Sequence, residues 1–259
     1  MNPLSDLQGK TIWVTGGAGY LGSAITAALD AHAAKVVCID LPGRAAKLVA
    51  EQKLERTFAH DLDVNDAATL PAAVRDLVDQ HGVPDGLVHL AFASSAGRTF
   101  EELPADEFQA TLEHSLTPTF VLCRELGTRM QKRGHGSLVL FASMYGVVAP
   151  DKHLYAEPMK PNPVDYGVSK AGLIQLTRYL AMHYGREGVR CNCVTPGPFP
   201  NPAVQSTHPE FVANLGQRTM LGRIGRNDEI VGPVLFLLSD AASFVTGHSL
   251  VVDGGWTVW

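Results

Sequence analysis

The stretch Thr15-Gly16-Gly17-Ala18-Gly19-Tyr20-Leu21-Gly22 joins a short β-rich run at residues 10–15 to a segment with helical spacing at 21–32. Glycines at such a junction allow a tight turn and a close approach of the backbone to a pyrophosphate, which then lies at the N-terminus of the helix. A glycine turn that binds nothing is the alternative, but the strand before it and the helix after it favour dinucleotide binding. The candidate cofactor contacts in this turn are Gly16, Gly19, Tyr20, Leu21 and Gly22.

Asp40 ends the next expected strand, at residues 35–40. A carboxylate at this position can accept hydrogen bonds from the 2′- and 3′-hydroxyls of an adenosine ribose, and it would repel a 2′-phosphate. The sequence therefore favours NAD over NADP as the cofactor. Arg44 could soften this preference, although a solvated arginine at the start of a helix is the favoured interpretation.

Further contacts of the adenosine are expected after the third and fourth strands. Asp63 and Val64 could bracket the adenine, with Asp61 as an alternative and helix capping as a competing role for Asp63. Ala91 and Phe92 lie in an apolar segment, and we expect them beside the adenosine ribose.

Strand and helix signals alternate along the chain, and the apolar runs are nearly continuous, as in strands covered on both faces. Strands are expected at residues 10–15, 35–40, 57–60, 86–91, 137–142, 190–195 and 249–252. Helices are expected at 21–32, 45–52, 66–81, 105–133 with a bend at Pro118, 166–184, 209–217 and 228–238. We therefore predict one α/β domain over residues 1–259, with a doubly wound parallel sheet of about seven strands flanked by helices. The irregular segments 147–164 and 196–208 should both lie at the carboxyl edge of that sheet, where open α/β folds bind ligands.

The composition is that of a globular protein, with 46% hydrophobic and 18% charged residues in 259. A formal net charge of −5 argues against a nucleic-acid or anionic-membrane partner. The first residues do not resemble a signal peptide, and no apolar run is long enough to span a bilayer. We therefore expect a cytoplasmic protein that acts on a small molecule.

The four cysteines are Cys38, Cys123, Cys191 and Cys193. Cys191 and Cys193 lack the spacing of a zinc knuckle or a redox pair, so we expect no metal site. Buried free thiols are the favoured interpretation.

The segment Tyr166-Gly-Val-Ser-Lys170 places a phenol and an amine about one helical turn apart, so both side chains leave the same face of the helix. A nearby ammonium favours the phenolate of a tyrosine, whose free pKa is about 10. Such a pair can act as a general acid and base. The spacing alone is common and usually marks a surface pair, but the dinucleotide turn and the upstream Ser143 favour catalysis.

With these residues in hand, the chain resembles the short-chain dehydrogenase/reductase family over essentially its full length. The supporting motifs are Thr15–Gly22, Ser143, Tyr166–Lys170, Asn192 with Pro196-Gly197, and Val252-Asp253-Gly254-Gly255. The resemblance implies a single NAD(P)-binding Rossmann domain and a homo-oligomer, either a dimer or a tetramer. It further implies that Tyr166 is the catalytic acid/base, that Lys170 lowers the Tyr166 pKa and binds the nicotinamide ribose, and that Ser143 polarises the substrate carbonyl. Pro196, Gly197 and Phe199, after the sixth strand, are further cofactor candidates on the same basis.

The sequence also departs from the family pattern. The spacing of Gly16, Gly19 and Gly22, and the segment His89-Leu90-Ala91, look like the branch that acts on nucleotide sugars, whereas the length and the C-terminal half look like the compact branch. Ser115 stands where a catalytic asparagine is expected, so Ser115 is a catalytic candidate and the usual proton relay is in doubt. Asn201 stands near a threonine that usually binds the nicotinamide amide.

These features predict an NAD(H)-dependent oxidoreductase that interconverts a secondary alcohol and a ketone. A polar, sugar-like substrate is favoured because segment 147–164 is rich in hydrogen-bonding groups, namely Asp151, Lys152, His153, Tyr155, Glu157, Lys160 and Asn162. A solvated lid or a subunit contact is an equally weighted role for this segment. The alternatives for the whole chain are a nucleotide-sugar epimerase or dehydratase, a 3-oxoacyl-type reductase, and a non-catalytic dinucleotide sensor. The apolar terminus with Trp256 and Trp259 suggests burial in an oligomer or against the same subunit.

Overall fold

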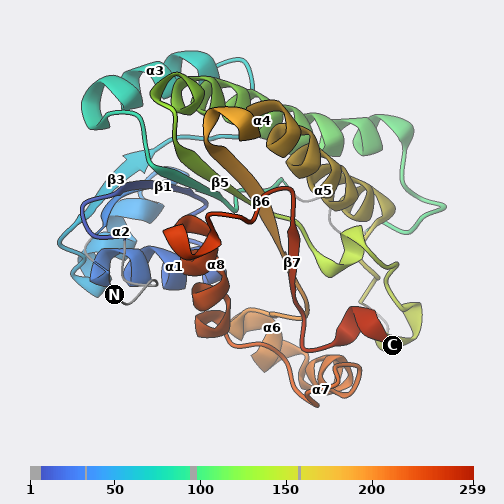
Figure 1. Ribbon diagram of the computed structural model, residues 1–259. Helices are drawn as coiled ribbons and strands as arrows, with labels where there is room; N and C mark the ends of the chain where they lie inside the picture. Colours follow the sequence, from blue (N-terminus) through green and yellow to red (C-terminus); the bar gives the residue numbers. More distant parts are fainter. Residues whose placement is uncertain (1–6, 33, 94–97, 157–158) are drawn as a thin grey trace.

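The computed structural model describes residues 7–32, 34–93, 98–156 and 159–259, and its centre is a parallel sheet of seven strands (Figure 1). The strand order is β3-β2-β1-β4-β5-β6-β7. The strands are β1 (Thr11–Thr15), β2 (Lys35–Asp40), β3 (Thr57–Asp61), β4 (Gly86–His89), β5 (Gly136–Phe141), β6 (Val189–Pro196) and β7 (Ser249–Val252). The predicted doubly wound α/β fold is confirmed.

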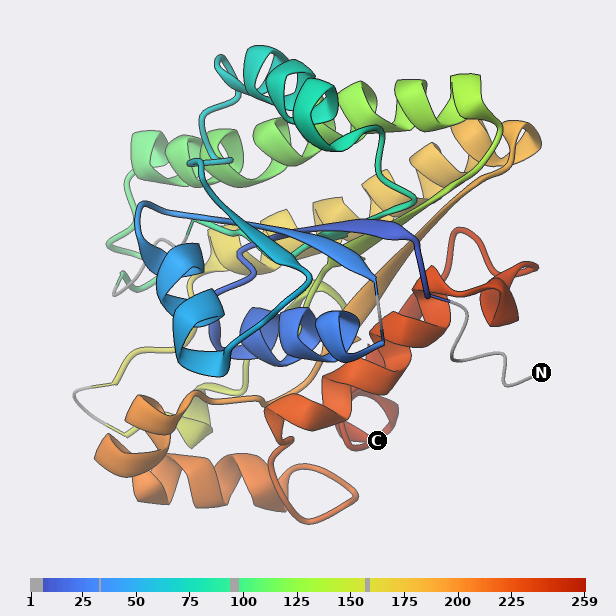
Figure 2. The same cartoon turned by 90° about the vertical axis from the view of Figure 1, so that its left-hand side faces the viewer.

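Helices cover both faces of the sheet (Figures 1 and 2). One face carries α3 (Leu70–His81), α4 (Ala105–Arg133) and α5 (Val164–Tyr184), and the other carries α1 (Tyr20–Ala31), α2 (Arg44–Gln52) and α8 (Val231–Leu238). Two further helices, α6 (Pro202–Thr207) and α7 (Pro209–Gln217), follow β6 at the carboxyl edge.

Alternation of side chains along β1 explains why its apolar run is continuous. Trp13 is buried in the cluster beneath α3, α4 and α5, whereas Ile12 and Val14 are buried in the cluster beneath α1 and α8. A strand with two covered faces needs an apolar residue at every position.

The sheet changes winding direction at β1, which has β2 on one side and β4 on the other. Connections run to opposite faces on the two sides of this point, so the loops after β1 and β4 diverge and leave a crevice. The glycine turn and residues 90–93 therefore border the expected ligand site.

Most expected elements are present, with a few differences in extent. The segment 196–208, expected to be irregular, contains α6, whose first turn is capped by Asn201 Oδ1 accepting from Val204 N–H at 3.0 Å. The predicted helix 228–238 begins as a 3₁₀ turn, Asn227–Ile230, before α8. Helix α3 starts at Leu70 rather than at residue 66, with a proline in its first turn. Helix α4 runs from Ala105 to Arg133 as one helix through Pro118.

The four cysteines are free and buried, as predicted. At the C-terminus, Trp256 is buried in a cluster with Met144, Tyr145 and Leu215 of the same chain. Trp259 Nε1 donates to Arg218 O at 3.0 Å, although this side chain is 71% exposed. Trp256 therefore folds back on its own subunit, which was one of the two expectations for the terminus.

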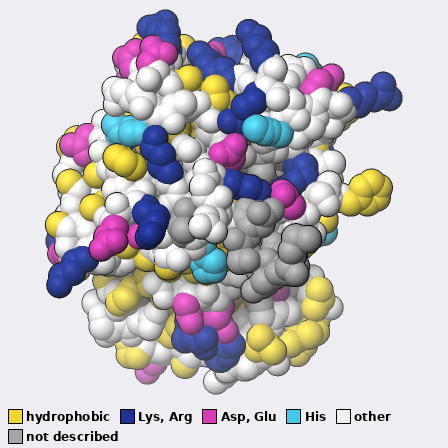
Figure 3. All heavy atoms as spheres, turned by 60° about the vertical axis from the view of Figure 1, so that its left-hand side comes forward, with side chains coloured by type: hydrophobic (Ala, Val, Ile, Leu, Met, Phe, Trp, Pro, Cys, Tyr) yellow, Lys and Arg dark blue, Asp and Glu magenta, His cyan; other side chains and the backbone are white. Residues whose placement is uncertain are grey.

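On the face drawn in Figure 3, basic and acidic side chains of the described residues are interspersed. In the described part of the chain, no helix is both long and apolar enough to cross a membrane.

Candidate active site

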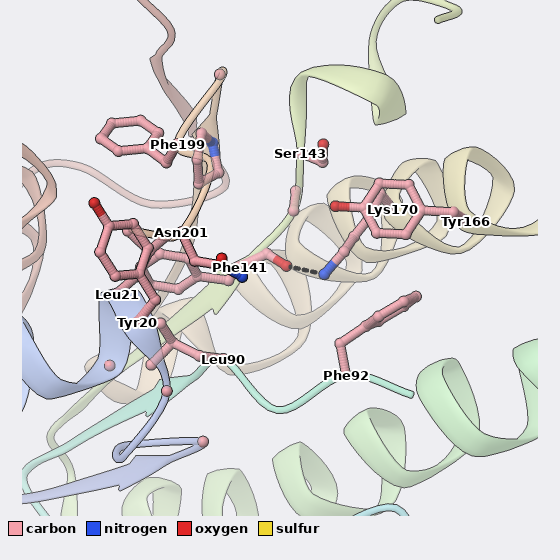
Figure 4. Close-up of a pocket in the computed structure, with 16 residues that line it drawn as sticks. Tyr20, Leu21, Leu90, Phe92, Phe141, Ser143, Tyr166, Lys170, Phe199 and Asn201 are labelled. Carbon is pink, nitrogen blue, oxygen red and sulfur yellow. Dashed lines mark hydrogen bonds between the residues drawn. The ribbon is translucent and has the colours of Figure 1, made fainter. Parts of the chain in front are cut away.

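A cleft of about 360 Å³ opens at the carboxyl edge of β1, β4, β5 and β6 (Figure 4). It brings together the glycine turn, the loop after β4, the end of β5, the start of α5 and the loop after β6. Its lining residues are Gly16, Gly19, Tyr20, Leu21, Gly22, Leu90, Phe92, Phe141, Ala142, Ser143, Tyr166, Lys170, Pro196, Gly197, Phe199 and Asn201. The candidates of the glycine turn, Ser143, Tyr166, Lys170 and the loop after β6 thus border one cavity. Asp40, Asp63, Val64 and Ala91 line a neighbouring cavity, and Ser115 lines neither.

The glycine turn is shaped to receive a bulky anion. Gly16 has a φ of +68°, and a Cβ on it would lie 2.8 Å from Ala91 N, so a larger residue would be strained and would collide with the loop after β4. Helix α1 starts with Gly19 as its N-cap and has no side-chain cap, which leaves the first backbone N–H groups to face a ligand. These features fit the pyrophosphate of a dinucleotide, which Tyr20, Leu21 and Gly22 would hold through their N–H groups.

Asp40 is buried, and its carboxylate already has hydrogen-bond partners. Its Oδ2 accepts from Ala18 N–H at 2.9 Å and its Oδ1 accepts from Leu41 N–H at 2.9 Å. Arg44 Nη1 lies 3.0 Å from Asp40 Oδ1, so the arginine expected to be solvated forms an ion pair with the predicted ribose contact. Oδ1 therefore has two donors, whereas Oδ2 has one and keeps a lone pair that can accept a ribose hydroxyl.

A second, smaller cavity of about 90 Å³ adjoins Gly16 on the adenosine side. Asp40, Arg44, Asp63, Val64, Ala91 and Phe92 are among its lining residues. Asp63 Oδ1 accepts from Asn65 N–H at 3.0 Å, whereas Asp61 Oδ1 accepts from Gly43 N–H at 3.0 Å. The expected adenine contacts Asp63 and Val64 therefore line one pocket, and the Asp63 carboxylate also stabilises the turn after β3 through its bond to Asn65.

Ser143, Tyr166 and Lys170 converge from two elements. Ser143 follows β5, and its Oγ accepts from Tyr145 N–H at 3.2 Å. Tyr166 and Lys170 lie in the first two turns of α5. Lys170 Nζ donates to Phe141 O at 2.9 Å, at the carboxyl end of β5 (Figure 4).

Burial controls the protonation of this pair. It lowers the pKa of Lys170 from 10.5 to about 7, because the side chain is almost fully removed from water. Burial also raises the pKa of Tyr166, and interaction with the Ser143 hydroxyl offsets part of that rise. Lys170 Nζ is bonded to Phe141 O and lies 5.7 Å from the centroid of the tyrosine ring, and burial is the largest cause of the Tyr166 shift. The expectation that Lys170 lowers the Tyr166 pKa stays a prediction.

Phe92 has a contact that the sequence did not predict. Its ring meets the Tyr166 ring edge-on with centroids 5.2 Å apart, and Lys170 Nζ lies 4.2 Å from the Phe92 centroid. The ring face attracts the ammonium. Phe92 lines both the cavity beside Asp40 and the larger cleft, so its side chain separates the two cavities. The sequence signal that could have indicated this contact is the position of Phe92 just after β4, since β4 is next to β5 in the sheet.

His89 forms a second unpredicted network behind the cleft. Its Nδ1 lies 2.6 Å from Thr15 Oγ1, and its Nε2 lies 2.8 Å from Thr119 Oγ1. Thr119 donates its own proton to Ser115 O, so its oxygen must accept from Nε2–H, and Nδ1 is left to accept from Thr15. Burial and the nearby Lys170 lower the pKa of His89 to about 3, which keeps the ring neutral. The network ties β1, β4 and α4 together.

Ser115 lies in the contact between α4 and α5. Its Oγ donates to Thr111 O at 2.6 Å and lies 3.1 Å from Ser169 Oγ. These bonds use the hydroxyl in helix packing, and a catalytic role for Ser115 stays a prediction. His114 is exposed and bonds to Ala110 O, as expected for a surface histidine.

A cavity of about 520 Å³ adjoins the cleft and shares Ser143, Tyr166, Gly197, Phe199 and Asn201 with it. Segment 147–164 forms one wall, although Glu157 and Pro158 lie outside the described residues. Tyr145 Oη and Tyr155 Oη lie 2.9 Å apart in this wall. Part of segment 147–164, for which we weighed a substrate contact against a lid or a subunit contact, therefore borders the same cavity as Ser143 and Tyr166. Asn192, by contrast, bonds through its amide to Val245 O and His248 N and has a structural role.

Among the described residues, no group of three or more His, Cys, Asp or Glu side chains is placed to hold a metal ion.

The chain is similar to known proteins in sequence and in fold. Residues 17–257 match the family described as Enoyl-(Acyl carrier protein) reductase. The chain is 33% identical to D-threitol dehydrogenase of Mycolicibacterium smegmatis, covering 97% of this chain and 94% of that protein. It is 31% identical to 2-dehydro-3-deoxy-L-rhamnonate dehydrogenase (NAD(+)) of Sphingomonas sp., covering 97% and 96%. A short chain dehydrogenase of Leptospira borgpetersenii, solved with bound NAD+, has a TM-score of 0.87 and 30% identity, covering 100% of this chain and 96% of that one.

The burial of Lys170 predicts a pH-dependent contribution to stability. With a folded pKa of about 7 against 10.5 in the unfolded chain, the folded protein binds fewer protons between these values, so its free energy of unfolding rises with pH there. Lys170→Met removes this titration. The free energy of unfolding of the wild type, minus that of Lys170→Met, should therefore increase when urea unfolding is measured at pH about 10 instead of about 7. A difference that stays constant across this window would contradict the buried-cation assignment.

Proposed function

Because the chain belongs to the short-chain dehydrogenase/reductase family, we propose that it interconverts a secondary alcohol and a ketone on a polyhydroxylated substrate, with NAD as hydride carrier. The observation that carries this proposal is the convergence of Ser143, Tyr166 and Lys170 on a cleft that also contains the glycine turn. A pyrophosphate site and a proton-transfer site in one cavity suit hydride transfer.

Each side chain of the site would have a separate role in alcohol oxidation. The Ser143 hydroxyl would hydrogen-bond to the substrate oxygen, and the Tyr166 phenolate would take the hydroxyl proton. A bound NAD+ supplies the hydride acceptor and a positive charge that favours the phenolate of a nearby tyrosine. Lys170, which has donors beyond the one used by Phe141 O, would bind the nicotinamide ribose and hold the start of α5 against β5. Pro196, Gly197 and Phe199 would border the nicotinamide.

The substrate cavity supports a polar substrate. Tyr145, Tyr155, Lys160, Asn162 and Asn201 place hydroxyl, ammonium and amide groups among its lining residues. Sugar hydroxyls can form hydrogen bonds with these groups, whereas an alkyl chain has no donor or acceptor to offer them. One relative is named for a neutral polyol and another for a sugar acid. Both compounds are polyhydroxylated, as is the substrate class proposed here.

The choice of NAD rests on Asp40, which lies at the rim of the adenosine pocket. A relative is named as NAD(+)-dependent and a structural neighbour was solved with NAD+. Arg44 beside Asp40 is the feature that could admit NADP.

A 3-oxoacyl-type reductase is the second candidate, since a neighbour of 28% identity and TM-score 0.87 is named 3-oxoacyl-[acyl-carrier protein] reductase. The polar lining of the substrate cavity favours the polyol over the acyl chain. The nucleotide-sugar epimerase and the dinucleotide sensor have no specific support in the site.

We further propose that the protein is a dimer or tetramer and that it works in the cytoplasm. The oligomer is supported by large apolar side chains exposed on α4 and α5, including Phe120, Tyr179 and Met182.

The proposed reaction is tested by NADH formation from polyols. Tyr166→Phe should lower kcat by about 10²- to 10⁴-fold while dinucleotide binding is retained, because only the transferable proton is lost. Ser143→Ala should also lower kcat strongly. Ser115→Ala is the matched control and should have a much smaller effect, because its hydroxyl serves helix packing. Equal losses in Ser115→Ala and Ser143→Ala would show that Ser115 has taken over the relay.

The cofactor preference is tested with Asp40→Ser. Loss of the carboxylate removes repulsion of a 2′-phosphate and frees Arg44 to bind it, so kcat/KM for NADP relative to NAD should rise about tenfold or more. The double variant Asp40→Ser/Arg44→Gln should lose this gain. A wild-type protein that uses both cofactors equally, with no change on substitution, would rule out Asp40 as the ribose contact.

The oligomer is tested by light scattering at micromolar concentration. Tyr179→Glu/Met182→Glu should dissociate the assembly, because two charges would be buried in an apolar contact. Lys47→Glu, at an exposed polar position of α2 on the other face of the sheet, is the control and should leave the mass unchanged. A wild-type monomer would refute the proposal.

A further inference from the structure

Lys160 is the charged side chain among the described residues that line the substrate cavity. The remaining described lining groups are neutral, and the polar ones among them are hydroxyls, amides and backbone. A single cation in the wall of a pocket favours a ligand that carries a negative charge.

Lys160 forms an ion pair with Glu102, which belongs to the segment before α4 and does not line the cavity. Lys160 Nζ lies 2.8 Å from Glu102 Oε2, and this hydrogen bond is the largest cause that lowers the pKa of Glu102 to about 2. The two side chains are 34% and 53% exposed, respectively. The ammonium is therefore held at the cavity by a carboxylate that comes from outside it.

An exposed ion pair of this kind contributes little net stability, because water screens it and two long side chains must be ordered to form it. A second carboxylate that enters the cavity can replace Glu102 at small cost and make the same charge-assisted hydrogen bond in a more enclosed place. Glu102 then acts as a competitor that keeps Lys160 oriented between turnovers.

We propose that the substrate is a sugar acid, with its reacting carbinol at Ser143 and Tyr166 and its carboxylate on Lys160. Tyr145 and Tyr155, whose hydroxyls are 2.9 Å apart in the same wall, bind hydroxyl groups between the two ends. This inference rests on the proposed function and narrows its substrate class from polyols in general to anionic ones.

The test compares substrates that differ only in the charged end. D-gluconate is paired with D-glucitol, and L-threonate with L-threitol, and kcat/KM is measured from NADH formation. The wild type should prefer each acid over its neutral partner by about tenfold or more, the effect of one charged hydrogen bond. Added salt should raise KM for the acids more than for the alditols.

Two substitutions should move this preference in opposite directions. Lys160→Met should lower the ratio of acid to alditol kcat/KM by about tenfold, and Lys160→Arg should restore most of it. Glu102→Gln should raise the ratio by lowering KM for the acids, because the competing carboxylate is gone. Lys152→Met is the matched control, because Lys152 is an exposed lysine of the same segment that does not line the cavity. The ratio of acid to alditol kcat/KM in Lys152→Met should equal that of the wild type.

The outcomes separate this inference from the reaction itself. Oxidation of alditols as well as or better than acids, or a ratio unchanged in both Lys160→Met and Glu102→Gln, would overturn the sugar-acid assignment and leave the proposed reaction standing. Absence of NADH formation from every acid and alditol would overturn the proposed function and this inference with it.

Discussion

A buried cation at the carboxyl end of β5 is the constraint on which the site depends. Lys170 is 5% exposed, and its ammonium has one hydrogen bond to Phe141 O and the face of Phe92 as neighbours. Removal of a charge from water is costly unless polar groups replace the lost hydration. The lowered Lys170 pKa reports that cost, and the bond to Phe141 fixes the start of α5 against the sheet, which in turn places Tyr166 beside Ser143.

A neutral histidine, His89 at the end of β4, is the second buried polar group near the cleft. Burial, and to a smaller extent repulsion from Lys170, lowers the pKa of His89, and its two hydroxyl partners need only a neutral ring. By joining Thr15 to Thr119, it links the strand that precedes the glycine turn to the helix that packs on α5. The cofactor half and the catalytic half are thus connected through buried polar groups as well as through the sheet.

The substrate side is built differently, because its polar groups range from the buried Tyr145 to the exposed Lys160 and two pairs of side chains satisfy each other there. Tyr145 and Tyr155 bond to each other, and Lys160 bonds to Glu102. Such pairs satisfy their members in the absence of a ligand and can be exchanged for a ligand's groups at small cost.

The sequence by itself determined the fold and the candidates for the reacting groups, because these depend on local patterns. Two-sided apolar strands require a covered parallel sheet, a glycine turn between strand and helix marks the anion site, and Tyr166 and Lys170 share a helix face at any tertiary arrangement. Tertiary structure alone decided which groups face each other across elements. The pairing of Arg44 with Asp40, the place of Phe92 on Lys170, the packing role of Ser115 and the His89 network depend on distances between segments far apart in the chain. The directions of the Tyr166 and Lys170 pKa shifts were also decided by the tertiary structure. Desolvation depends on everything that surrounds a group and not only on its neighbours in sequence.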